Sequence, residues 1–356
     1  MPKINKHIEI VSSSIAGLSS MSEKSRLTIQ QSLAKSYKTV GITLVDSEAD
    51  LTTLIENKPD IVFLGMACVP RKPTPSNSHP QIWLADELHK NNIPYSGSGT
   101  DAMVLESDKL KAKKVIKKAG LSTAPFFMAY TGQFTSESQL VLDFPMFVKP
   151  PKLGAGVGVD KYSVVRNYRE YKTKIAKLDK DLDSEALVET YLTGREFTVA
   201  ILENESPVLN PETNELEASY QVMPLELIAP VNSNGDSIIG SKVKSSDSEK
   251  ASLISDPSLK QEISDLAINC FKLLGAKNFG RIDIRCDENG VGYFMEANLI
   301  PSLIEDYGNF QKACSLNNKI SYDKMLLRIV DLGFKGYTPY VAPLPPEPKP
   351  VLATVR

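Results

Sequence analysis

The sequence predicts an α/β chain with an open Rossmann-like sheet at its N-terminal end, followed by an α+β region. Between residues 8 and 95, short apolar runs alternate with amphipathic stretches, which is typical of a parallel sheet with helices packed against it. Near the other end, residues 280–285 and 293–298 alternate polar and apolar side chains with period two, which indicates two half-buried strands. The two halves therefore require different kinds of sheet.

The N-terminal region contains three predicted strands, at residues 8–11, 39–45 and 60–65. The third is a continuous apolar run, which suits a strand buried on both faces of a parallel sheet. Ser22 caps a helix expected to end near residue 35, and residues 82–90 predict a second helix. A dinucleotide site is not expected, because no GxGxxG motif follows the first strand.

The middle of the chain begins with a predicted helix over residues 109–119, which Asp108 caps. Strands are predicted near residues 126–130 and 145–150, with a helical segment near 136–142 between them. The same patterns predict strands near 162–165, 186–192, 193–202 and 223–228, a helix from 257 to 274 and a helix near 322–332.

A glycine-rich turn follows the strand at 145–150. Gly154, Gly156 and Gly158 alternate along it, and such glycines allow backbone N–H groups to approach a phosphate closely. Ordinary hairpin glycines account for the pattern equally well, and no Gly-Lys-Ser/Thr follows to make a Walker loop. The turn by itself is weak evidence for a phosphate site.

The expected domain boundaries follow these elements. They are 1–104 for the Rossmann-like domain, 105–194 for a central domain, 195–336 for a C-terminal domain and 337–356 for a Pro-rich tail. A polar loop at 232–250 is long enough to indicate a function or disorder. The tail is expected to be extended or disordered, or to bind a partner as a peptide.

The two strands near the C-terminal end predict a hairpin with a chemical function. Alternation places Arg281 and Asp283 on one face of the first strand, and Glu296 and Asn298 on one face of the second. The hairpin gathers a guanidinium, two carboxylates and an amide, and oxygen ligands of this kind suit Mg²⁺ shared with substrate phosphates. The alternative is a hairpin face that is merely solvated.

Composition excludes several classes of protein. The 356 residues carry a net charge of −2, with 41 basic and 43 acidic residues, so bulk charge does not indicate nucleic-acid binding. No apolar run approaches the length of a membrane span. The four cysteines show no CxxC spacing, and three scattered histidines do not indicate a zinc site. A cytoplasmic protein without a nucleic-acid or membrane partner is expected.

Five motifs, taken in order, resemble those of the ATP-grasp superfamily, and within it those of D-alanine–D-alanine ligases. They lie at residues 107–109, 145–150, 154–158 and 188–199, and at 280–283 together with 295–298 and Pro301. The likeness covers about residues 5 to 335 and is strongest after residue 101. It implies an ATP-grasp fold in which the central and C-terminal domains hold ATP between them.

The resemblance implies a role for each matched residue on the nucleotide side. Lys109 and Lys149 would contact the α- and β-phosphates as point charges. Glu189 and the backbone around Tyr191 and Leu192 would contact the adenine edge, and Glu196 the ribose hydroxyls. The loop formed by Gly154, Ala155, Gly156 and Gly158 would cover the β- and γ-phosphates. Lys242, or Lys244 two residues away, would reach the γ-phosphate from the long polar loop.

The resemblance also implies the chemistry. Asp283, Glu296 and Asn298 would hold two Mg²⁺ ions, with Mn²⁺ as an alternative, and Arg281 would stabilise the oxyanion of a tetrahedral intermediate. The expected function is an ATP-dependent carboxylate–amine ligase that forms an amide bond through an acyl phosphate. Its partners are then small-molecule acid and amine substrates, and the family suggests a homodimer.

The sequence departs from those ligases on the substrate side. Ala155 and Gly156 replace a Ser-Ser pair, and residues 65–67 lack a His-Gly. Residues 12–18 lack the acid that, in those ligases, meets the first amino group. The segment after the hairpin also differs, at residues 301–308. Glu305 and Asp306 in this segment, together with Arg285, are substrate-side candidates or ordinary surface charges. These departures favour amino-acid substrates other than two D-alanines. A D-alanine–D-alanine ligase with a rearranged pocket and a non-catalytic nucleotide-binding interaction protein remain the alternatives.

Overall fold

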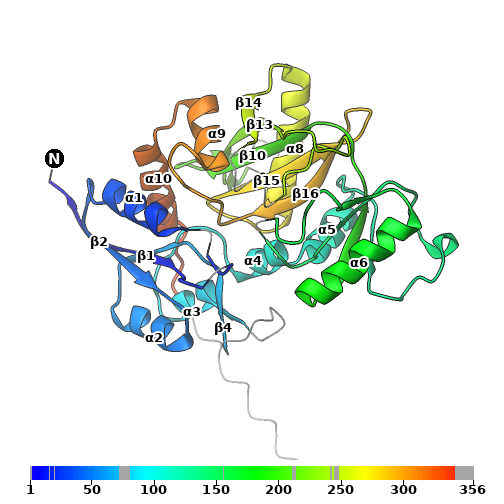
Figure 1. Ribbon diagram of the computed structural model, residues 1–356. Helices are drawn as coiled ribbons and strands as arrows, with labels where there is room; N and C mark the ends of the chain where they lie inside the picture. The colour runs from blue at the N-terminus through cyan, green and yellow to red at the C-terminus, as the bar shows by residue number, and fades with distance from the viewer. Residues whose placement is uncertain are drawn as a thin grey trace, which may run out of the picture.

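The described part of the computed structural model contains three sheets of three or more strands, with helices between and around them (Figure 1). The structure describes residues 2–15, 17–19, 21–71, 81–154, 156–210, 214–240, 243 and 248–340. Most of the Pro-rich tail, part of the long polar loop, Ala155, Lys242 and Lys244 lie outside these residues.

The N-terminal sheet is parallel and open, as the sequence predicts. Its order is β2 (Tyr37–Leu44), β1 (Ile4–Ser12) and β3 (Ile61–Leu64). Its helices are α1 (Glu23–Leu33), α2 (Glu48–Glu56) and α3 (Leu84–Lys90). The Ser22 side chain accepts a hydrogen bond from the backbone of Ser25, which caps α1 as predicted. The helix predicted from residue 82 starts later, because β5 (Gln81–Trp83) pairs with β4 (Cys68–Pro70).

The central sheet is antiparallel. Its order is β6 (Phe126–Ala129), β9 (Ala186–Thr190), β7 (Met146–Lys149) and β8 (Val164–Val165). Helix α6 (Tyr168–Leu182), which the sequence analysis did not include, packs on it through an apolar stripe. The helical segment predicted near 136–142 is wrong except for a short 3-10 turn, η1 (Glu137–Gln139). Beyond η1, Leu140 and Leu142 both pack against the core, which an extended chain permits for residues two apart.

The C-terminal sheet is the largest and is antiparallel. Its order is β14 (Lys250–Leu253), β13 (Tyr220–Ile228), β10 (Glu196–Glu203), β15 (Phe279–Cys286) and β16 (Gly292–Asn298). Helix α8 (Pro257–Leu273), whose apolar stripe the sequence predicts, covers one face together with α4 (Thr100–Ser107) and α5 (Lys109–Lys118). Part of the other face is covered by α9 (Asn309–Asn318) and α10 (Tyr322–Lys335). A small hairpin, β11 (Val208–Leu209) and β12 (Leu216–Glu217), stands apart from this sheet.

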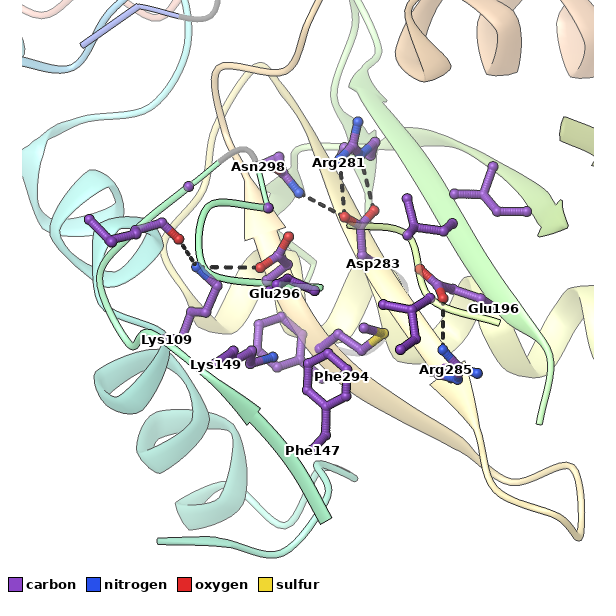
Figure 2. Close-up of a pocket in the computed structure, with 18 of the residues that line it drawn as sticks. Lys109, Phe147, Lys149, Glu196, Arg281, Asp283, Arg285, Phe294, Glu296 and Asn298 are labelled. Carbon is purple, nitrogen blue, oxygen red and sulfur yellow. Dashed lines mark hydrogen bonds and ion pairs between the residues drawn. The ribbon is translucent and has the colours of Figure 1, made fainter. Parts of the chain in front are cut away.

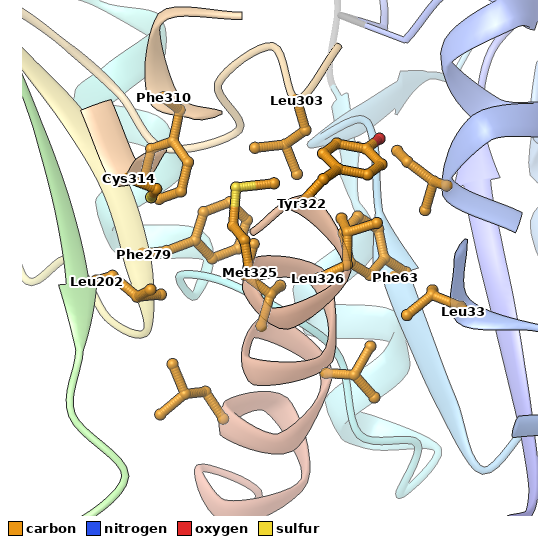
Figure 3. Packing of buried hydrophobic residues seen from close by; sticks show 14 of the residues in the cluster. Leu33, Phe63, Leu202, Phe279, Leu303, Phe310, Cys314, Tyr322, Met325 and Leu326 are labelled. Carbon is orange, nitrogen blue, oxygen red and sulfur yellow. The ribbon is translucent and has the colours of Figure 1, made fainter. Parts of the chain in front are cut away.

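Helix α10 joins the N-terminal sheet to the C-terminal sheet. Figure 3 shows it between the two, with Met325 and Leu326 among the labelled side chains. The same hydrophobic cluster contains Phe63 of β3 and Leu202 of β10, all with less than 2% of their surface exposed. Burying a side chain of this size contributes about 1.5–3 kcal/mol. The N-terminal sheet is therefore held against the C-terminal sheet by a continuous core.

Candidate functional site

The hairpin of β15 and β16 brings together the four polar side chains expected there. Arg281 pairs in register with Asn298, and Asp283 with Glu296, so all four point to one face (Figure 2). Arg281 donates from Nε and Nη2 to the two carboxylate oxygens of Asp283, each at 3.0 Å. Asn298 donates from Nδ2 to Oδ2 of Asp283, also at 3.0 Å. Asp283 is the centre of this group.

Asp283 is fixed from a third strand as well. Thr198 of β10 donates its hydroxyl to Oδ1 at 2.7 Å. Burial works against the charge of Arg281, but Asp283 and Glu296 nevertheless raise the pKa of its guanidinium above the ordinary value. Arg281 therefore remains a cation beside the two carboxylates.

The two lysines expected at the phosphates reach the same region from other elements. Lys109, the first residue of α5, donates from Nζ to the backbone oxygen of Leu153 at 2.8 Å. Its Nζ also lies 3.5 Å from Oε2 of Glu296. Lys149, at the end of β7, is buried, and its Nζ lies 2.7 Å from Oε2 of Glu189. The lysines thus approach the hairpin from the α5 side and from the central sheet (Figure 2).

A third lysine, which the sequence analysis missed, completes a buried triad with Glu189 and Lys149. Lys113 of α5 has 1% of its surface exposed and pairs with Oε1 of Glu189. It also donates to the hydroxyl of Thr123 at 2.8 Å. Helical periodicity could have identified it, because it lies four residues after Lys109 on the face that buries Ile116. The expected contact of Glu189 with adenine stays a prediction, since lysines now face both its oxygens.

The charges of this triad depend on one another. Burial raises the pKa of Glu189, but Lys113 and Lys149 together lower it by more than burial raises it. The net pKa lies below the ordinary value, and the carboxylate is ionised. Burial lowers the pKa of Lys113, whereas Glu189 keeps the pKa of Lys149 above its ordinary value. With both lysines charged, two cations and one anion lie beside the cavity, a balance that favours an anionic ligand.

An apolar slot with a polar rim lies toward the end of the sheet that carries Glu196. The ring of Tyr191 stacks on Phe147 with centroids 6.3 Å apart, and the guanidinium of Arg285 lies 5.4 Å from the Tyr191 centroid. Arg285 pairs with Glu196 at 3.1 Å and donates to the backbone oxygen of Ser237 at 2.9 Å. Leu192 also lines the cavity. Stacked rings beside a carboxylate can accommodate a planar base and a sugar.

The glycine-rich turn borders the same space. Gly154 and Gly156 line the cavity, and the φ of Gly156 is +75°. Gly158 has a φ of +77°, and a Cβ there would lie 2.6 Å from the side chain of Pro150. Both positions therefore require glycine, for backbone conformation and, at Gly158, for space. Ala155, Lys242 and Lys244 lie outside the residues that the structure describes, so their predicted roles stay predictions.

One cavity of about 440 Å³ connects these groups, within the range usual for small-molecule sites. Its lining includes Lys109, Lys149, Glu189, Tyr191, Leu192, Glu196, Arg281, Asp283, Glu296 and Asn298. Of the substrate-side candidates, Arg285 lines it, whereas Glu305 and Asp306 are exposed and do not, so these two are not supported. Glu249, absent from the sequence analysis, does line it. No helix among the described residues is long and apolar enough to cross a bilayer.

The family model and the similar known proteins all indicate the same family. The family model described as D-ala D-ala ligase C-terminus matches residues 115–331. A D-alanine–D-alanine ligase of Hydrogenovibrio crunogenus is 27% identical over 245 residues, which are 67% of this chain and 69% of that protein. One from Pelotomaculum thermopropionicum is 31% identical over 225 residues, 61% of this chain and 65% of that protein.

Solved structures show the same fold over most of the chain. The D-alanine–D-alanine ligase of Bacillus anthracis complexed with ATP superposes with a TM-score of 0.68 at 19% identity, covering 93% of this chain and 98% of that one. The enzyme of Coxiella burnetii gives a TM-score of 0.65 at 17% identity, covering 93% and 94%. These findings confirm the predicted fold and ligase class. Because the family model matches more than half of the chain, the chain belongs to the D-alanine–D-alanine ligase family and is an ATP-dependent carbon–nitrogen ligase with the ATP-grasp fold.

Proposed function

We propose that this ligase joins the carboxylate of one amino acid, or amino-acid-like acid, to the amine of another through an acyl phosphate. The observation that carries the proposal is the set Arg281, Asp283, Glu296 and Asn298 on one hairpin face, with Lys109 against it. A binding protein would need a cavity, but it would not need this combination of carboxylates and cations around one point. The reaction class therefore accounts for the site better than nucleotide binding alone.

ATP would occupy the cavity between the central and C-terminal sheets. Its base would lie in the slot of Phe147, Tyr191 and Leu192, with the ribose near Glu196. Its phosphates would extend toward Lys109 and Lys149, because a lysine ammonium is a compact positive charge that pairs with phosphate oxygens. The Bacillus anthracis ligase structure is a complex with ATP, and its matching fold supports this placement.

The hairpin suits Mg²⁺. Asp283, Glu296 and the amide oxygen of Asn298 are hard oxygen ligands, and the two carboxylates are direct partners across the strands. Within the described residues, no three His, Cys, Asp or Glu side chains form a metal cluster. A site with two carboxylates is typical of Mg²⁺ that takes its remaining ligands from water and substrate phosphates. Bound there, Mg²⁺ would neutralise charge that develops on the phosphates.

The protein's own groups then account for the two steps. In the first step, the substrate carboxylate attacks the γ-phosphate, and ADP leaves. In the second step, the amine attacks the acyl carbon, a C–N bond forms, and the C–O bond to phosphate breaks. Arg281 remains charged beside Asp283 and would stabilise the oxyanion of the tetrahedral intermediate, which forms when the amine attacks and collapses when phosphate leaves. The cavity would keep water from the acyl phosphate while the amine binds.

The substrates are proposed to differ from two D-alanines, because residues 12–18 lack an acid and Tyr307, in the altered segment after the hairpin, lines the cavity. The relatives carry the name D-alanine–D-alanine ligase, so that pair is the second candidate. A cavity that keeps the nucleotide-side residues but has other substrate-side residues is compatible with both substrate assignments. Measuring turnover with each set of substrates decides between them.

The test is formation of ADP from Mg-ATP by the purified chain, with pooled D- and L-amino acids and mass spectrometry of the products. An amide that needs two co-substrates supports the proposal, and turnover with D-alanine alone supports the second candidate. Glu296→Gln removes one metal-ligand charge, so we expect ADP formation to fall at least a hundredfold and EDTA to abolish the wild-type rate. Unchanged turnover in Glu296→Gln would contradict the metal assignment, and Glu56→Gln, at an exposed position of α2, is the control.

A further inference from the structure

The cavity contains another carboxylate, which the roles above do not use. Glu249 lines it immediately before β14, the edge strand of the five-stranded sheet. In the strand register, Ala251 pairs with Leu227, which pairs with Glu196. Because side chains alternate along a strand, Glu249 extends from the same sheet face as Glu196 and Arg281. It therefore belongs to the wall that carries the reactive groups.

One oxygen of Glu249 is held in place, and the other lacks a donor. Asn309, the first residue of α9, donates from Nδ2 to Oε1 at 3.2 Å. Oε2 is buried and has no hydrogen-bond partner among the residues that the structure describes. The large majority of buried side-chain polar atoms in folded proteins are hydrogen-bonded, so an unpaired carboxylate oxygen on a residue that lines a cavity points to a ligand that supplies the donor.

Charge defines what that ligand is. Glu249 is close enough to Arg281 to contribute to the raised pKa of the guanidinium. The segment before Asn309 adds Ser302 and Tyr307 to the cavity wall, and both are neutral. The free oxygen of Glu249 thus provides a negative charge near the group assigned to the oxyanion. An ammonium group is the matching donor, since it carries three N–H groups and a positive charge.

We propose that Glu249 binds the ammonium group of an amino-acid substrate and selects that substrate against the corresponding hydroxy acid. The inference rests on the proposed function, because it places the amino acid in the cavity of the ligase. It also explains how the chain can dispense with an acid in residues 12–18. A carboxylate from the edge of the C-terminal sheet, instead of the N-terminal domain, would set amine selectivity.

The test compares matched ligands that differ only in the charged group. Saturation-transfer NMR on the full chain with Mg²⁺ and a non-hydrolysable ATP analogue measures binding of D-alanine against D-lactate and of L-alanine against L-lactate. We expect the wild type to bind at least one alanine tenfold or more tightly than its lactate. In Glu249→Gln this preference should fall below twofold, while affinity for the ATP analogue stays within twofold of the wild type. Glu56→Gln should match the wild type throughout.

Each other result overturns the proposal. A wild type that does not prefer alanine in either pair has no ammonium subsite, and a Glu249→Gln variant that keeps the preference places the subsite elsewhere. Joint loss of alanine binding, nucleotide affinity and thermal stability in Glu249→Gln would mean that Glu249 supports the fold or pairs with a cation of the adjoining loop. Failure of the proposed function is distinguishable, because it would abolish ADP formation in the wild type and leave the ammonium preference intact.

Discussion

The buried triad of Lys113, Glu189 and Lys149 predicts an unequal response to two neutralising substitutions. Glu189→Gln leaves two buried lysines facing each other without their anion. Removing one partner of a buried ion pair costs about 3–5 kcal/mol, because the remaining charge is uncompensated. Lys113→Met removes the lysine whose pKa burial already lowers and leaves Glu189 paired with Lys149 at 2.7 Å. We therefore expect Lys113→Met to lower the free energy of opening by about 1–2 kcal/mol, which is close to the cost of leaving one buried polar group unsatisfied.

The double variant Lys113→Met/Glu189→Gln measures the energetic coupling between the two side chains. It removes one of the two facing cations together with the anion, so its cost should be at least about 1 kcal/mol below the sum of the single costs, as is usual for residues in one network. Hydrogen exchange of the β9 amides, followed by mass spectrometry without nucleotide, reports the local free energy of opening in the central sheet. Fluorescence of Trp83, the single tryptophan, reports on β5 and on the C-terminal core cluster against which it packs, and it is the comparison outside the central sheet.

Two results would refute this reasoning. If Glu189→Gln opened β9 no more readily than the wild type does, the three charges would not stabilise one another. If Lys113→Met cost more than Glu189→Gln, Lys113 would act through packing around Ile116 and not through its charge. A change confined to Trp83 fluorescence would place the effect outside the central sheet.

Two further predictions concern pH dependence and the core. Burial raises the pKa of Glu106 to about 7 from an ordinary value of 4.5, with its Oε1 accepting from the backbone N–H of Leu299. The folded chain thus binds the extra proton, and the free energy of unfolding should fall by at most about 3.4 kcal/mol as the pH rises from about 4.5 to 7. Thermal melts of Glu106→Gln in EDTA should show a flatter pH profile, and an unchanged profile would contradict the assignment. Met325→Ala should cost about 2–5 kcal/mol in urea unfolding, because it opens a cavity between the two sheets. The exposed Leu316→Ala should cost less than about 0.5 kcal/mol, and equal costs would exclude α10 as the connecting core.

The sequence alone determined those features that chain neighbours control. Period-two alternation placed Arg281, Asp283, Glu296 and Asn298 on one face, because side chains alternate along any strand and a hairpin joins the two faces. Caps at Ser22 and Asp108 likewise located two helix starts, since each side chain bonds a backbone N–H three residues on. Helix α9 and strand β14 were missed, because short amphipathic segments in polar surroundings give weak periodicity.

Tertiary structure decided which distant residues share a site. Lys113, Glu189 and Lys149 come from α5, β9 and β7, and only the packing of α5 beside the central sheet brings their charges together. Glu249 reaches the cavity because β14 joins the sheet edge and α9 supplies Asn309. Local propensity does not encode such contacts, whose sequence separations exceed the reach of helix or strand periodicity. The polar face of the hairpin was therefore predictable, while the buried Lys113 and the cavity-lining Glu249 were not.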